Sequence, residues 1–235
     1  MTHATRVTTP VTISARPQPY RFIHKGLRAL MLRTLTQMAT LDARRDDERG
    51  DMVAAVTELL QFCSDHLQHE NAFFHAPLRA RAPRAVLPFD DDHEGHEIAI
   101  GQLQAQLAQL AGGGALATTH AHSLYLALSR FVGENLEHMA EEETTLTEAL
   151  WAHFSDAEIL AMGEALRASL SAQEAAYALR WIARGLNDEE VGELLGKAQG
   201  ELSPAAYTGL LAMVSHELSA ERRQRLPAGL LSRAA

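Results

Sequence analysis

The chain has 235 residues, which is enough for one large domain or for a domain with an extension. Hydrophobic residues make up 46% of it, so it can build a packed core, and disorder is excluded for most of its length. The 21 Lys and Arg residues against 30 Asp and Glu residues give a net charge of −9, which argues against nucleic-acid binding. The unusual feature is histidine, with 12 residues against seven Phe and four Tyr.

Cysteine content and hydropathy indicate the cellular compartment of the protein. Cys63 is the only cysteine, so neither an internal disulfide nor a thiolate metal cluster can form. No apolar run reaches the roughly 18 residues that a membrane span needs, and the N-terminus lacks the apolar stretch of a signal peptide. We therefore expect a cytoplasmic protein with no membrane partner.

The first part of the chain is predicted to form a helical bundle. Residues 1–19 are rich in Thr and Pro, and we expect a flexible lead there. The spacing of apolar residues then predicts four long helices, over residues 20–42, 51–78, 90–111 and 118–154. Asp90 to Asp92 are good caps for the third helix, and Pro83 and Pro88 predict a loop before it. Four long helices with short links favour an all-α, up-down-up-down four-helix bundle over residues 20–154.

Residues 155–235 have a different pattern, typical of shorter helices. Possible capping boxes pair Ser155 with Glu158, Ser171 with Glu174, and Asn187 with Glu190. They predict helices near residues 156–168, 172–185, 188–199, 204–216 and 219–225. We interpret this region as a helical C-terminal extension that packs on the bundle, on a protein partner or on a second copy of the chain.

Three of the long helices repeat one arrangement of histidine and glutamate. The segments read H-L-Q-H-E from His66, H-E-G-H-E from His93 and H-M-A-E-E from His138, and the first helix adds a lone histidine. Spacings of three and four residues place these side chains on one helix face. The residues that fall on the apolar face are the candidate metal ligands: His24, His66, Glu70, His93, His96, His138 and Glu142.

Burial and topology both favour a metal at these residues. A carboxylate on an apolar helix face is costly unless it is paired or bound to a metal. In an up-down-up-down bundle, the candidate residues of all four helices lie toward the same end. Seven donors exceed what one divalent ion needs, whereas two ions bridged by Glu70 and Glu142 would use them and keep positions open for a small molecule.

These residues resemble the hemerythrin-like (HHE cation-binding) domains over residues 20–154. The resemblance depends on His24, on the H-x-x-x-E pairs of His66 and His138, and on the histidine that opens the third helix. It implies a non-haem diiron centre, with two iron ions, bridging carboxylates and terminal histidines. Family members bind or sense O2, handle NO, sense iron or help repair iron–sulfur centres.

The sequence departs from the oxygen carriers and from the repair proteins of this family. The histidines of the third helix are three residues apart, where the carriers have four, and Glu142 follows His138 by four residues, where the carriers have five. The cysteine-bearing N-terminal domain of the repair proteins is missing. Neither specific activity is therefore transferred to this chain.

Several alternatives stay open at this point. Both His93 and His96 bind metal, or one binds and the other supports it; zinc or manganese satisfies the same ligands as iron. Binding or sensing of O2, NO or iron is favoured over a diiron enzyme acting on peroxide or NO, because no dedicated catalytic acid is visible. A metal-free helical scaffold is the third reading. Five other histidines are assigned ordinary structural roles: His75, His120, His122, His153 and His216, whereas His69, Glu97 and Glu141 are expected to border the site.

Overall fold

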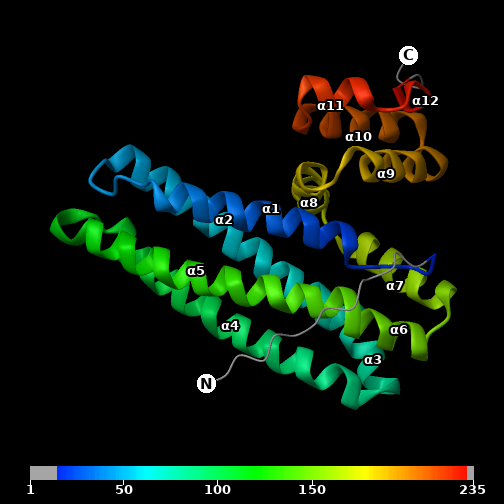
Figure 1. Ribbon diagram of the computed structural model, residues 1–235, viewed down its shortest axis with the longest axis horizontal. Coiled ribbons are helices and arrows are strands. Elements are labelled where there is room, and N and C mark those ends of the chain that lie inside the picture. Colours follow the sequence, from blue (N-terminus) through cyan, green and yellow to red (C-terminus); the bar gives the residue numbers. More distant parts are fainter. Residues whose placement is uncertain (1–14, 232–235) are drawn as a thin grey trace, which may run out of the picture.

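The structure is a computed structural model that describes residues 15–231, and none of these residues lies in a β-strand (Figure 1). The longest helices are α1 (Arg21–Ala39), α2 (Asp46–Glu70), α4 (Pro83–Ala111) and α5 (Ala117–Glu141). Helix α1 packs against α2 and α5, and α4 packs against the same two helices. Their facing sides enclose one apolar core, which confirms the prediction of an all-helical fold.

Two of these helices change their winding near one end. Helix α2 continues through the π-helical turn η1 (Asn71–His75) into α3 (Ala76–Arg81). Helix α5 continues in the same way through the π-helical turn η3 (Glu142–Leu146) into α6 (Thr147–His153). Each π-turn adjoins one of the two candidate carboxylates, since Glu70 ends α2 and Glu142 begins η3. Single π-helical turns within α-helices are frequent at functional sites.

The loop predicted around Pro83 and Pro88 was wrong. Only Ala82 interrupts the helices here, with φ −144° and ψ 66°, and α4 begins at the next residue. Pro83 takes the first helical position, where the missing N–H has no partner in any helix, so it starts a helix instead of preventing one. Pro88 lies inside α4, where it removes one backbone hydrogen bond.

Helix α2 also begins five residues earlier than expected. Gly50, just before the predicted start at residue 51, lies inside it. Three acidic residues, Asp46, Asp47 and Glu48, occupy the first turn, where negative charge interacts favourably with the helix dipole. The Arg49 guanidinium adds a bond to the carbonyl oxygen of Ala43 (2.9 Å) and holds the preceding turn.

The C-terminal helices follow a regular pattern. They are α7 (Asp156–Ser169), α8 (Ala172–Gly185), α9 (Asp188–Glu201), α10 (Pro204–Glu217), α11 (Ala220–Arg225) and α12 (Ala228–Leu231). The three predicted capping boxes are present at the starts of α7, α8 and α9. The N-cap residues recur every 16 positions along the chain: Ser155, Ser171, Asn187, Ser203 and Ser219.

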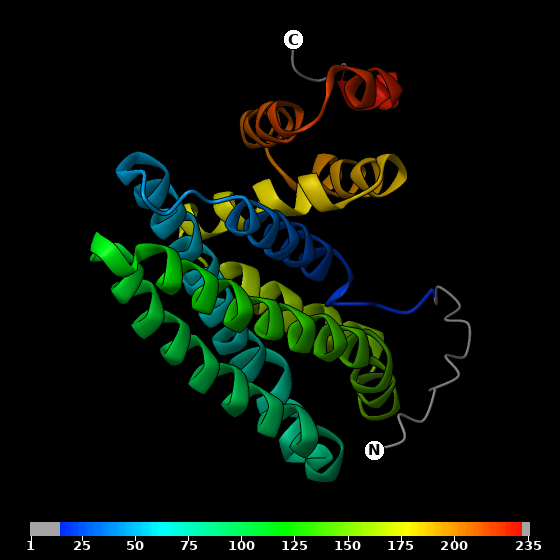
Figure 2. The same cartoon turned by 60° about the vertical axis from the view of Figure 1, so that its left-hand side comes forward.

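Helix α8 joins two apolar cores. Trp181 belongs to the core of the long helices, while Ala183 and Leu186 belong to a second core that includes residues of α9 and α10. The yellow-to-red helices α8 to α12 lie on the other side of α1 from α4 and α5 (Figure 2). Helices α1 and α8 touch through glycines: a Cβ on Gly185 would lie 2.3 Å from the carbonyl oxygen of Lys25. The close approach of the two backbones therefore requires glycine.

The predicted flexible lead over residues 1–19 lies mostly outside the described residues, which begin at position 15. The part that is described contacts the end of the bundle. Arg16 donates to the Asp156 carboxylate (2.7 Å), and the Trp151 indole N–H donates to the carbonyl oxygen of Pro17 (2.8 Å). Within residues 15–231, no helix combines the length and the apolar character needed to cross a membrane.

Candidate metal centre

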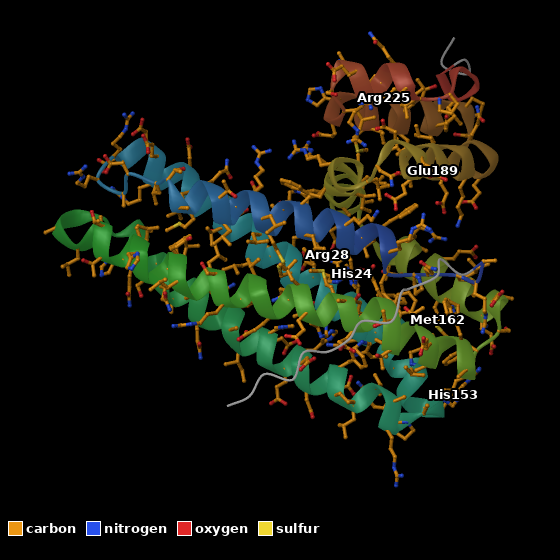
Figure 3. The ribbon with its side chains drawn as sticks, viewed as in Figure 1. His24, Arg28, His153, Met162, Glu189 and Arg225 are labelled. Atoms are coloured by element: carbon orange, nitrogen blue, oxygen red, sulfur yellow. The ribbon has the colours of Figure 1, made fainter. Side chains whose placement is uncertain are left out.

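A buried cluster of histidine and glutamate lies where the two π-turns face α1 and α4, at the level marked by His24 and Arg28 in Figure 3. Residues from α1, α2, η1, α4, α5 and η3 meet there, and their exposed fractions run from 0 to 9%. The members of the cluster are His24, His66, Glu70, His75, His93, His138 and Glu142. Six of these seven are ligands that the sequence analysis proposed.

The first group of donor atoms lies between α1, α2 and η3. Glu70 Oε1 is 3.3 Å from His24 Nε2 and 3.2 Å from His66 Nε2. Glu142 Oε2 is also 3.3 Å from His24 Nε2. One ligand atom from each of these four residues lies within 4.8 Å of those of the other three, which is the spacing that a single metal ion requires.

The second group surrounds the other oxygen of Glu142. Its Oε1 atom lies 3.6 Å from His75 Nε2, 3.5 Å from His93 Nε2 and 3.3 Å from His138 Nε2. The Nε2 atoms of His93 and His138 are 3.0 Å apart, and Glu70 Oε2 is 3.7 Å from His93 Nε2. Both glutamates therefore present one oxygen to each group, in the manner of bridging carboxylates.

Several of these buried atoms have no hydrogen-bond partner among residues 15–231: Nε2 of His66 and His75, Oε2 of Glu70, and both carboxylate oxygens of Glu142. They lie 3.2–3.7 Å from other atoms of the cluster without forming hydrogen bonds, and a buried polar atom left unpaired costs about 1–3 kcal/mol. Ligands about 2.1 Å from an octahedral ion lie about 3.0 Å from each other. The donor types and spacings therefore fit the binding of metal.

The outer nitrogen of four of the imidazoles is held by an oxygen atom. The Nδ1 partners are Glu143 for His24 (3.2 Å), Asp90 for His75 (3.0 Å), Asn71 for His93 (2.8 Å) and Asp92 for His138 (3.2 Å). Arg28 in turn donates to Glu143. A hydrogen bond at Nδ1 fixes the tautomer and the ring orientation, and it directs Nε2 toward the centre of the cluster.

The pKa values of the cluster follow its charges. Burial opposes a positive charge on His24, but contacts with Glu143 and Glu70 outweigh burial and raise its pKa to about 9. Burial lowers the pKa of His66 to about 4. Burial opposes a negative charge on Glu142, yet contacts with His138, His75 and His93 hold its pKa well below the ordinary value. Without metal, the buried carboxylates therefore keep their charge by retaining protons on imidazoles.

This proton retention predicts a pH dependence of the metal-free protein. The folded-state pKa of His24, about 9, exceeds its unfolded value of 6.5, so its contribution to stability is complete below pH 6.5 and is lost as the pH rises through 9. We expect the free energy of unfolding after chelation to fall by on the order of 2 kcal/mol between about pH 6.5 and pH 8.5. Denaturant titrations measure this. His24→Gln should flatten the dependence and His153→Gln should keep it, and an unchanged or rising stability would contradict the expectation.

His96 is the one predicted ligand that the structure leaves outside both groups. It faces His138 edge-on, with ring centroids 4.9 Å apart, and it contacts Phe131 in the same way at 6.1 Å. Burial, with the nearby His138, lowers its pKa to about 4, and its Nδ1 is buried without a hydrogen-bond partner in the described part of the chain. His96 thus borders the second group.

His75 takes a place in the cluster that the sequence analysis did not give it. In an α-helix, at about 100° per residue, it would lie about 180° away from His66 on the opposite face. It lies at the end of the π-helical turn η1, whose i→i+5 hydrogen bonds change the rotation per residue, and its Nε2 lies 3.6 Å from Glu142 Oε1. No residue pattern encodes this turn; the one signal in the sequence is that His75 stands beside Phe74 and three residues before Leu78, both of which are buried.

The supporting residues around the cluster were missed as well. Asp90 and Asp92 were assigned to capping the third helix, but both lie within α4 and bind His75 and His138. Their spacing from His93 carries no signal because their partners are on other helices. His69, Glu97 and Glu141, which we expected to border the site, belong to neither group of donor atoms.

Comparisons with known proteins do not add to this picture. No protein-family model matches the chain, and neither a curated protein nor a solved structure matches it. The arguments for function therefore depend on the geometry and the chemistry of the cluster. That geometry establishes buried histidine and glutamate groups that could hold a metal ion in a helical protein.

Proposed function

We propose that this protein holds two iron ions in a hemerythrin-like, up-down-up-down four-helix bundle, and that it binds or senses O2, NO or iron itself. The observation that carries the proposal is the shared position of Glu142 between two buried groups of donor atoms. A single ion would leave one of the two groups uncompensated. Two ions bridged by Glu142 and Glu70 give every buried carboxylate oxygen a positive partner.

The number of donors supports a site with open positions. Five imidazole nitrogens and four carboxylate oxygens make nine donor atoms, since 5 + 4 = 9. Two six-coordinate ions offer about twelve positions, so about three are left for small ligands. Imidazole with carboxylate also suits zinc and manganese, but structural zinc sites are closed and four-coordinate. The surplus of positions favours iron or manganese over zinc, and iron would supply reversible coordination of diatomic molecules when it is bound.

The surroundings favour a small ligand over a large substrate. One cavity of about 260 Å³ lies between α2 and α4, and another of about 510 Å³ lies between α3 and α7; neither is lined by a residue of the cluster. The ring of Phe89 packs against His75 and His138, and Phe89 shares an apolar core with Phe74 and Leu146, which excludes water from this side. The side chain of Asp92 is 57% exposed and contacts buried His138, which belongs to the second group of donor atoms. Asp92 therefore connects this group to the protein surface.

Metal loading tests the proposal. We expect the purified full-length chain, loaded with ferrous iron without oxygen, to retain two iron ions, and anomalous scattering at the iron edge to place one in each group of donor atoms. Absorption in the near ultraviolet should then change reversibly with O2 or NO. Retention of less than about a quarter of an equivalent of iron, zinc or manganese would contradict the proposal and favour a metal-free scaffold. Peroxide turnover that is lost in Glu70→Ala would favour the enzyme instead.

A further inference from the structure

Tyr20 lies directly beside the metal centre although it is not among the ligand residues. It precedes α1 by one position and is 1% exposed. Its ring stacks on that of His24, with centroids 5.4 Å apart and 18° between the planes, and it tilts against Phe74 at 5.4 Å. Tyr20 therefore forms the boundary between the cluster and the apolar side chains that cover it.

The hydroxyl group of Tyr20 has no hydrogen-bond partner within residues 15–231, although it is buried. A buried unpaired hydroxyl costs about 1–3 kcal/mol, and phenylalanine would provide the same ring without this cost. Tyr207, which is equally buried, shows the usual arrangement, because its hydroxyl donates to the carbonyl oxygen of Leu230 (2.9 Å).

The Tyr20 side chain is within electrostatic reach of both glutamates of the cluster. Burial raises its pKa well above 10, and the negative charges of Glu142 and Glu70 raise it further. The hydroxyl thus lies close enough to feel both carboxylates that bridge the two groups of donor atoms. A buried O–H group without a partner, on a ring that stacks on His24, is a hydrogen-bond donor beside the first group of donor atoms.

We propose that the Tyr20 hydroxyl donates a hydrogen bond to the small ligand held at the metal pair. This inference rests on the proposed function, since the acceptor is a molecule bound at the iron ions. It makes Tyr20 the residue that selects among ligands, because those with a nitrogen or oxygen acceptor pointing away from the metal gain a bond and others do not. The arrangement also explains why a polar ring occupies an otherwise apolar cover.

Azide is a suitable probe, because it binds iron and has free nitrogen acceptors. We expect iron-loaded Tyr20→Phe to keep the iron content of the wild type and to bind azide about tenfold more weakly, the loss of one hydrogen bond. Tyr177→Phe is the matched control: its hydroxyl is also buried and unpaired, but its ring packs on Phe62, and azide affinity should not change. Titration of the azide absorption band measures both.

A second measurement does not depend on iron. The metal-free Tyr20→Phe protein should melt at the same temperature as the wild type or higher, because it loses only an unpaired hydroxyl. A clear fall in melting temperature, equal azide affinities, or a visible phenolate–iron band present only in the wild type would each overturn the proposal. Failure of the wild type to take up iron would overturn the proposed function too, and the iron content separates this result from the others.

Discussion

Glu142→Gln is expected to lower the affinity for iron by more than about a hundredfold. Glu142 is fully buried and gives one oxygen to each group of donor atoms, at 3.3 Å from His24 and 3.3 Å from His138. The amide keeps the size of the side chain but removes the charge that two cations would share. Both metal positions should therefore be affected together, and metal analysis after anaerobic loading measures the loss.

Glu141→Gln is the matched control for this substitution. Glu141 is the last residue of α5, adjacent to Glu142, and its carboxylate accepts from the Thr145 hydroxyl (3.0 Å) instead of facing the cluster. This variant should retain most of its iron. Equal losses in the two variants would contradict the helical register that places Glu142 inside, and full retention in Glu142→Gln would contradict the bridging role. Circular dichroism should show that both variants are folded.

Gly185→Ala is expected to destabilise the contact between α8 and α1 by about 3 kcal/mol. The added Cβ would lie 2.3 Å from the carbonyl oxygen of Lys25 and 2.8 Å from the amide nitrogen of Gly26, both backbone atoms that no side-chain rotation can remove. The two helices must therefore separate, and Trp181 must withdraw from the core of the long helices. Because Lys25 follows His24, iron affinity should fall as well.

Gly192→Ala, in the middle of α9, provides the comparison. Nothing lies within 4 Å of a Cβ at this position, so the only effect is the better helix propensity of alanine, worth about 1 kcal/mol of added stability. Denaturant titration of both variants measures the two opposite shifts. A stability of Gly185→Ala equal to that of the wild type would show that the backbones are not in close contact.

The parts of the fold that could be predicted are those encoded by neighbouring residues. The capping box at the start of α7 needs only Ser155 and Glu158, so its formation depends little on tertiary structure. The start of α4 could not be predicted in the same way, because Pro83 is compatible both with a loop and with the first turn of a helix. The surroundings decide: Val86 and Phe89 are buried, and burying them favours the helix.

The candidate site shows the same division. His66 with Glu70, and His138 with Glu142, could be placed on one face because four residues span one turn of a regular α-helix. This α-helical spacing no longer applies after the two carboxylates, where both helices change to π-helical winding. The place of His75 in the cluster could therefore not be predicted. The choice between His93 and His96 depends on the rotation of α4 in the bundle, which is set by packing against α2 and α5.

The recurrence of N-caps at 16-residue intervals has a consequence for how this chain can change length. Each unit from Ser155 onward starts with its own cap, and the units that end at Leu170, Leu186, Leu202 and Leu218 all stop at a leucine in an extended conformation. Helix α8 makes the close backbone contact with α1, and α10 packs on α8 within the second apolar core, so that the units are coupled to one another. A change in length by 16 residues would keep the spacing of the caps, whereas a change by any other number would break it.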